Sequence, residues 1–237
     1  MEIIIPRSVS KIAVFFCLIF IAGQLNATEE VYAPDVGEGR YIITPKAAAT
    51  PRINGPSIFG VRPGNPFLYA IPATGDRPME FSVKDLPAGL TVNPDNGHIT
   101  GRITSPEKKT YNVKLRVNNS KGSDAKAFRI VVGDQIALTP PLGWNSWNCW
   151  HQKVSQEKVL ESAKAMSVAG LQRVGWMYIN MDDGWQAKRG GKHNAVMPNV
   201  KFPDMKGMVD QIHAMGFKAG IYHTPWVGSD AGYCGGS

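Results

Sequence analysis

The pattern of hydrophobic and polar positions differs between three regions of the chain. Between residues 51 and 134, short apolar runs alternate with Pro-Gly, Thr-Gly, Asn-Gly and Lys-Gly turn signals. In one of these runs, apolar side chains at every second position alternate with Asn112, Lys114 and Arg116. A period of two residues is typical of a strand with one buried face and one solvent-exposed face. The runs predict an all-β sandwich, with strands at Phe67–Ile71, Met79–Val83, His98–Ile103, Tyr111–Val117 and Ala127–Val132.

The second half of the chain has a different period. Ser155–Ala169 has apolar residues at helical spacing, with a serine suited to cap its start and a glycine after its end. Pro203 opens a second helix, whose apolar stripe consists of Met205, Met208, Val209, Ile212 and Met215. Two apolar strands complete the pattern, Met177–Met181 and Phe217–Tyr222. Strands that alternate with helices in this way predict parallel βαβ construction.

The first 50 residues differ from both regions. Arg7 and Lys11 precede an apolar run, Ile12–Ala22, that is too short to cross a bilayer comfortably. A basic start, an apolar centre and a small-residue end predict an export signal at Met1–Ala27, with a retained membrane anchor as the alternative. We therefore expect a secreted or periplasmic protein without stable membrane insertion after cleavage. Thr28–Thr50 contains several Pro and Gly residues and is predicted to be a linker.

Composition narrows the classes of function. The net charge of +7 comes from lysines and arginines that are scattered along the chain, so nucleic acid is not an expected partner. Five histidines stand singly, and none has a partner at metal-ligand spacing. No metal site and no cofactor are therefore expected. Cys149 and Cys234 follow the predicted leader; whether they pair is left open, since two cysteines are not a disulfide framework.

Residues with candidate chemistry lie at the ends of the predicted parallel strands. The aromatic faces of Trp147 and Trp185 suit the C–H-rich faces of sugars, whereas Trp176 is predicted to be a core residue. Asp182 and Asp183 end the predicted strand at Met177–Met181, and neighbouring strand residues point to opposite sides. They therefore do not form a glycosidase acid/base pair, which in retaining enzymes flanks one bond at about 5–5.5 Å. Hydrogen bonds to substrate hydroxyls suit them better, and a capping role is the structural alternative.

Several motifs, in order, resemble one enzyme family. Four stretches look like the opening, the second strand, the next helix and the third strand of glycoside hydrolase family 27, the α-galactosidase family. They are Thr139–Trp147 (TPPLGWNSW), Tyr178–Trp185 (YINMDDGW), Phe202-Pro203 and Gly216–Tyr222 (GFKAGIY). Pro51–Asp134 is similar to an immunoglobulin-like module that is often attached to bacterial enzymes, through Phe67-Leu68-Tyr69, Leu86–Leu90 and Gly97–Gly101.

These resemblances imply a fold and an activity. The fold would be an all-β immunoglobulin-like sandwich at residues 51–134, followed at residues 139–237 by the first βα units of a (β/α)8 TIM barrel. The activity would be that of an exported retaining hydrolase that releases terminal α-linked galactose from an oligosaccharide or glycan. Matched position by position, the sugar pocket would be lined by Trp147, Asp182, Asp183 and Tyr222. The family's nucleophile belongs to a later Lys-x-Asp strand motif and its acid/base is later still. Both catalytic carboxylates are thus expected beyond Ser237, and the chain is expected to be an inactive fragment.

The sequence also departs from the family's pattern. Gly184 stands where the family often has a cysteine, so the disulfide implied there cannot form. His223–Trp226 replaces a more usual polar turn, which leaves the sugar open. The alternative within enzymes is a related specificity, such as α-N-acetylgalactosaminidase or β-L-arabinopyranosidase. The alternative outside enzymes is a non-catalytic carbohydrate-binding or interaction protein with the sandwich as its working part.

Overall fold

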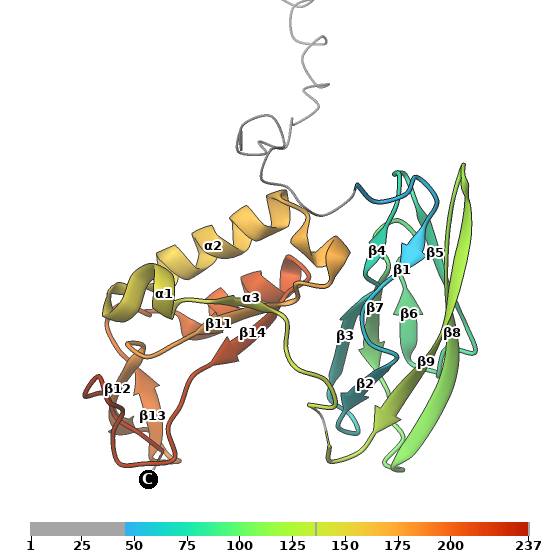
Figure 1. Ribbon diagram of the computed structural model, residues 1–237. Coiled ribbons are helices and arrows are strands. Elements are labelled where there is room, and N and C mark those ends of the chain that lie inside the picture. The colour runs from blue at the N-terminus through green and yellow to red at the C-terminus, as the bar shows by residue number, and fades with distance from the viewer. Residues whose placement is uncertain (1–45, 136, 237) are drawn as a thin grey trace, which may run out of the picture. The chain divides into compact units, whose positions relative to one another are not determined.

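The computed structural model describes residues 46–135 and 137–236 (Figure 1). The predicted leader, Met1–Ala27, lies outside these residues, as does most of the predicted linker, of which residues 46–50 are exposed. The described residues belong to one compact unit. None of the helices in the described ranges combines the length and the apolar character that a bilayer crossing requires.

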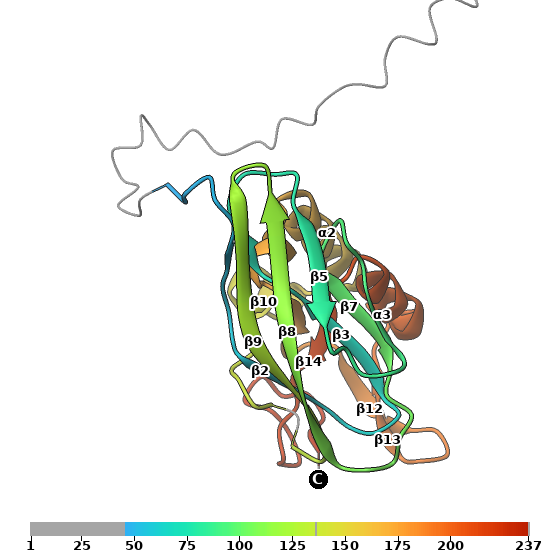
Figure 2. The same ribbon diagram turned by 90° about the vertical axis from the view of Figure 1, so that its right-hand side faces the viewer.

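Residues 51–134 fold into a sandwich of two main sheets (Figure 2). The larger sheet has the order β2 (Ile58–Val61), β9 (Gly122–Val132), β8 (Lys109–Asn119), β5 (Glu80–Lys84). The smaller sheet has the order β3 (Pro66–Ala70), β7 (His98–Arg102), β6 (Leu90–Val92). A short antiparallel pair joins β1 (Arg52–Ile53) to β4 (Ala73–Thr74). The neighbours in both main sheets are antiparallel, except that β2 and β9 run parallel.

The polar and apolar alternation of the sequence is visible in β8. Its side chains at Val113, Leu115 and Val117 are at most 4% exposed, while Lys114 and Arg116 between them face solvent. The hairpin to β9 is closed by Asn119, whose Oδ1 accepts the backbone N–H groups of the two residues that end the turn. All five predicted strands of the sandwich are confirmed. Four further strands of two to four residues, β1, β2, β4 and β6, were not predicted because they are too short to show a period.

The second region, residues 139–236, is called here the α/β segment. Its centre is a parallel sheet in the order β10 (Gly143–Asn145), β11 (Tyr178–Met181), β14 (Lys218–Ile221). The connections contain the short helix α1 (Trp147–Trp150), the helices α2 (Gln156–Val168) and α3 (Met205–Ala214), and the 3-10 turns η1 (His151–Lys153) and η2 (Leu171–Val174). The predicted parallel βαβ construction is confirmed. A hairpin between β11 and α3 was not predicted: it pairs β12 (Gln186–Gly190) with β13 (Ala195–Pro198).

Both long helices begin at side-chain caps and end at glycines. The Ser155 hydroxyl accepts a backbone N–H of the first turn of α2, as its sequence position predicted. The cap of α3 is Asp204, so this helix begins slightly later than the predicted start at Pro203. Gly170 and Gly216 follow the two helices with φ angles of +67° and +84°. This left-handed backbone favours glycine and turns each chain back toward the next strand.

Candidate functional site

The carboxyl ends of the three parallel strands bring the predicted site residues to one edge of the sheet. Trp147 follows β10, Asp182 and Asp183 follow β11, and Tyr222 follows β14. This edge, with Asn145 at the end of β10, is called here the carboxyl edge. Open parallel sheets and βα barrels bind their ligands at this end of the strands, because the connecting loops there can carry varied side chains.

The end of β10 fixes the carboxylate of Asp182. Asn145 Nδ2 donates a hydrogen bond of 2.8 Å to Asp182 Oδ2, and the backbone N–H of Asp182 donates to Ser146 Oγ at 2.9 Å. Ser146 is fully buried. The Oδ1 of Asn145 in turn accepts the backbone N–H of Trp147 at 2.8 Å. Asn145 therefore orients both the half-buried carboxylate of Asp182 and the start of the loop that carries Trp147.

Asp183 has a different set of partners from Asp182. Its side chain is 4% exposed, and its Oδ1 accepts a hydrogen bond of 2.6 Å from Gln186 Nε2. Gln186 Oε1 accepts the backbone N–H of Gly184 at 2.9 Å, which closes a small polar network beneath the loop. The two neighbouring aspartates thus lie in different surroundings. Binding of sugar hydroxyls by either one stays a prediction.

A glycine suits the turn that follows the two aspartates. Gly184 has a φ of +105°, and a Cβ added there would lie 3.3 Å from the backbone of Gln152 and from the side chain of Val154. The residue that replaces the family's cysteine is therefore the one that this backbone favours. Cys149 and Cys234 are both free thiols, so they form no disulfide with each other.

The two tryptophans predicted to lie at the site differ in accessibility. Trp147 is half-buried, and its ring centroid lies 5.1 Å from that of His151 in an edge-on arrangement. Trp185 is only 5% exposed and packs in the core of the α/β segment, where its Nε1 donates to the backbone carbonyl of Tyr222 at 2.9 Å. It supports the loop after β14 and presents no open face. The prediction that Trp176 is a core residue is wrong, because its side chain is 39% exposed.

Tyr222 places a phenol at the carboxyl edge. Its backbone N–H donates to the carbonyl of Met181 at 2.7 Å, which ties it to the end of β11. Desolvation, followed by the nearby carboxylates of Asp183, Asp182 and Asp230, raises the pKa of the Tyr222 phenol above its usual value. The phenol therefore stays protonated at neutral pH, when it can donate one hydrogen bond and accept others.

Sequence reasoning missed the polar residues that hold the site together. In the sequence, Asn145, Ser146 and Asn180 gave no signal of a functional role. Their importance comes from contacts with residues that are distant in the sequence. Asn180 lies beside Gly220 of the neighbouring strand, where an added Cβ would fall 1.8 Å from the Asn180 Oδ1. The available signal was their position, since Asn145 and Asn180 lie at or next to the last residue of a parallel strand.

Comparisons with known proteins match both regions of the chain. Residues 50–133 match the family described as "Putative Ig domain", and residues 139–237 match the family described as "Alpha galactosidase A". An α-galactosidase of Coffea arabica is 37% identical over 115 residues, which are 48% of this chain and 29% of that protein. The chain thus spans less than a third of the length of this curated relative.

Two crystal structures from Bacteroides fragilis resemble this chain over most of its length. One, described as a putative α-galactosidase, is 40% identical with a TM-score of 0.71, covering 81% of this chain and 41% of that one. The other, described as a putative α-galactosidase/melibiase, is 38% identical with a TM-score of 0.70, covering 79% of this chain and 40% of that one. The chain therefore carries an immunoglobulin-like domain followed by an α-galactosidase-like segment, as the motifs of residues 139–222 indicated.

Proposed function

We propose that the whole protein is an exported glycoside hydrolase of the α-galactosidase type, which releases terminal α-linked galactose from an oligosaccharide or glycan with retention of configuration. The single observation that carries this proposal is the carboxyl edge. There, Asn145 orients the carboxylate of Asp182 beside the loop of Trp147, and the main chain of Tyr222 is tied to the same strand end. Carboxylate, phenol and indole are the groups that bind sugar hydroxyls and pack against sugar C–H faces.

Asp182 is suited to bind a hydroxyl because it is held before the substrate arrives. Its Oδ2 accepts one bond from Asn145 and its Oδ1 accepts one from the backbone N–H of Asp183. A carboxylate offers about four lone-pair sites, so each oxygen retains capacity for a sugar hydroxyl. Trp147 would pack against the ring and Tyr222 would line the pocket. Asp183, whose Oδ1 is already bonded to Gln186, would bind through its other oxygen.

We further propose that the parallel sheet continues into a (β/α)8 barrel and that the nucleophile and the acid/base come from later strands. The parallel order of β10, β11 and β14, with helices in the connections, supports the barrel. Asp182 and Asp183 do not supply the catalytic pair, because they are adjacent in sequence and engage different partners, with Asp183 buried. Export is proposed from the sequence of Met1–Ala27, and the N-terminal sequence of the mature protein checks it.

The proposal is tested in a longer chain that includes the later strands, by comparing Asp182→Asn with Asp210→Asn. Asp210 is an exposed aspartate of α3 that pairs with Lys206, so it controls for the chemistry of the substitution. Loss of a charged hydrogen bond of about 1.5–3 kcal/mol should lower kcat/KM for a nitrophenyl α-galactoside by about ten- to a hundredfold in Asp182→Asn. Asp210→Asn should match the wild type. Equal activity in the two variants would show that Asp182 lies outside the pocket.

The sugar is tested with a panel of nitrophenyl glycosides. If the proposal is correct, kcat/KM is highest for the α-galactoside. A preference for the N-acetyl-α-galactosaminide or the β-L-arabinopyranoside would replace galactose with one of these sugars and leave the class of enzyme intact. No hydrolysis of any member by the longer chain, combined with sugar binding, would favour the non-catalytic alternative.

A further inference from the structure

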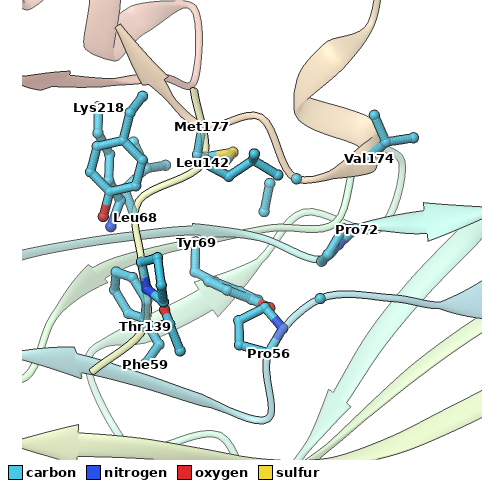
Figure 3. Close-up of a pocket in the computed structure, with 15 residues that line it drawn as sticks. Pro56, Phe59, Leu68, Tyr69, Pro72, Thr139, Leu142, Val174, Met177 and Lys218 are labelled. Carbon is cyan, nitrogen blue, oxygen red and sulfur yellow. The ribbon is translucent and has the colours of Figure 1, made fainter. Parts of the chain in front are cut away.

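An apolar cavity of about 350 Å³ lies at the opposite edge of the parallel sheet, where its strands begin (Figure 3). This edge, formed by the first residues of β10, β11 and β14, is called here the amino edge. On one side the cavity is lined by residues of the α/β segment, among them Met177, Tyr178 and Lys218. On the other side it is lined by residues of the sandwich, among them Phe59, Tyr69 and Pro72.

The ammonium of Lys218 lies between aromatic rings of the two regions. Its Nζ is 3.7 Å from the ring centroid of Phe59, on β2 of the sandwich, and 5.5 Å from that of Tyr178, on β11. Among the described residues no carboxylate pairs with it. A cation held over ring faces is attracted by their electron density, and the attraction increases where water is excluded. The first residue of β14 therefore lies against the sandwich.

Two glycines bring the backbone of the α/β segment close to the sandwich. A Cβ added at Gly216, two residues before β14, would lie 2.4 Å from Cε1 of His98 on β7. A Cβ added at Gly175, before β11, would lie 3.4 Å from Cβ of Pro72. Both glycines have positive φ angles. The loops that lead into two neighbouring strands are therefore packed directly against the sandwich.

The sandwich surface does not resemble a sugar-binding platform. In residues 51–134, all of which the structure describes, no large hydrophobic side chain is exposed. Sugar-binding surfaces present aromatic faces to solvent, whereas the rings of Phe67, Phe81 and Phe128 are buried in the core of the sandwich. Phe59 packs against this core but is only half-buried, and its ring faces the cavity.

The same arrangement is shared with a solved structure. The Bacteroides fragilis structure matches 81% of this chain with a TM-score of 0.71. Neither the sandwich nor the α/β segment alone amounts to 81% of the chain, so the match includes both regions in one superposition. A shared placement in two proteins that are 40% identical indicates a fixed contact.

We propose that the sandwich is the docking base of the α/β segment: it covers the amino edge of the parallel sheet, unfolds together with it, and leaves the carboxyl edge free for substrate. Its partner is therefore the α/β segment of the same chain. In βα barrels the amino ends of the strands serve stability while the carboxyl ends serve chemistry, which agrees with this division. The inference does not depend on which sugar the protein binds.

The experiment uses the whole 237-residue chain and the variant Gly216→Ala, with Gly170→Ala as a matched control. Both glycines follow a helix at the same position with positive φ, so both alanines strain the backbone alike. Only Gly216 faces the sandwich, because a Cβ at Gly170 meets the flexible side chain of Arg173 at 3.3 Å. Urea unfolding is followed by tryptophan fluorescence, which reports on the α/β segment alone, since all six tryptophans lie after Pro141.

If the sandwich is docked, Gly216→Ala reduces the ratio of folded to unfolded chain at least about fivefold more than Gly170→Ala does, and a second change, His98→Ala, restores most of the loss. Equal losses in the two single variants, with no relief from His98→Ala, would overturn the proposal. If Gly216→Ala does not fold while Gly170→Ala does, the double variant that carries both Gly216→Ala and His98→Ala decides. If this double variant folds, the docking proposal is supported; if it does not fold, the proposal is overturned.

Discussion

The most informative single substitution is Lys218→Met, which removes a charge at the docked amino edge and keeps a long, unbranched side chain. Burial lowers the pKa of the Lys218 ammonium from 10.5 to about 8. At about 1.4 kcal/mol for each pKa unit, the protonated Lys218 side chain lowers the free energy of unfolding by up to about 3 kcal/mol. Methionine fills similar apolar space and carries no charge, so this cost should disappear in the variant.

The sign of the pH dependence follows from the direction of the shift. Below about pH 8, Lys218 is protonated in both the folded and the unfolded chain, and the full cost of burying the charge is present. Between about pH 8 and 10.5 the folded chain has released the proton while the unfolded chain still binds it, so the stability of the wild type rises with pH. The free-energy advantage of Lys218→Met should therefore be largest at pH 6–7 and decrease by about 2 kcal/mol toward pH 10.

The assay is urea unfolding of both chains at one-unit steps from pH 6 to 10, followed by tryptophan fluorescence. The difference between the two free energies of unfolding cancels the titration of all other groups. Lys109→Met is the control. The Nζ of Lys109 also lies near an aromatic ring, 5.2 Å from the ring centroid of Tyr111, but Lys109 is exposed, so its substitution should change stability by less than about 0.5 kcal/mol. A difference that stays flat from pH 6 to 10 would refute the burial of Lys218 against the sandwich.

Two further predictions concern the carboxyl edge. Ser146→Ala should lower the free energy of unfolding by about 1–3 kcal/mol, because the buried hydroxyl accepts the backbone N–H of Asp182. The control Ser162→Ala, within α2, should cost less than about 0.5 kcal/mol, and equal losses on urea unfolding would contradict the role of Ser146. The 237-residue chain should release no nitrophenol from a nitrophenyl α-galactoside above a protein-free blank, because its neighbouring aspartates do not form a catalytic pair. Measurable turnover by the purified chain would show that its own residues suffice for the chemistry.

The sequence alone determined the elements whose stability is local. The alternation in Tyr111–Val117 predicted the buried face of β8, because successive strand residues point to opposite sides whatever the partner strand is. Ser155 and Gly170 marked the ends of α2, because capping and left-handed backbone depend on a few neighbouring residues. The hairpin β12–β13 escaped prediction because neither short strand, Gln186–Gly190 or Ala195–Pro198, shows a regular alternation of apolar and polar residues. It is held instead by contacts such as Arg189 with the backbone carbonyls of Asn194 and Gly235.

The tertiary structure alone decided which residues form the site and which support it. The sequence showed Asp182 and Asp183 as equals, but folding left one half-buried beside Asn145 and placed the other in a buried contact with Gln186. It also placed Trp185 in the core, and Lys218 between the rings of Phe59 and Tyr178, which lie more than a hundred residues apart in the sequence. Burial and charge environment depend on these long-range contacts. A periodic pattern records only how each residue relates to its neighbours along the chain.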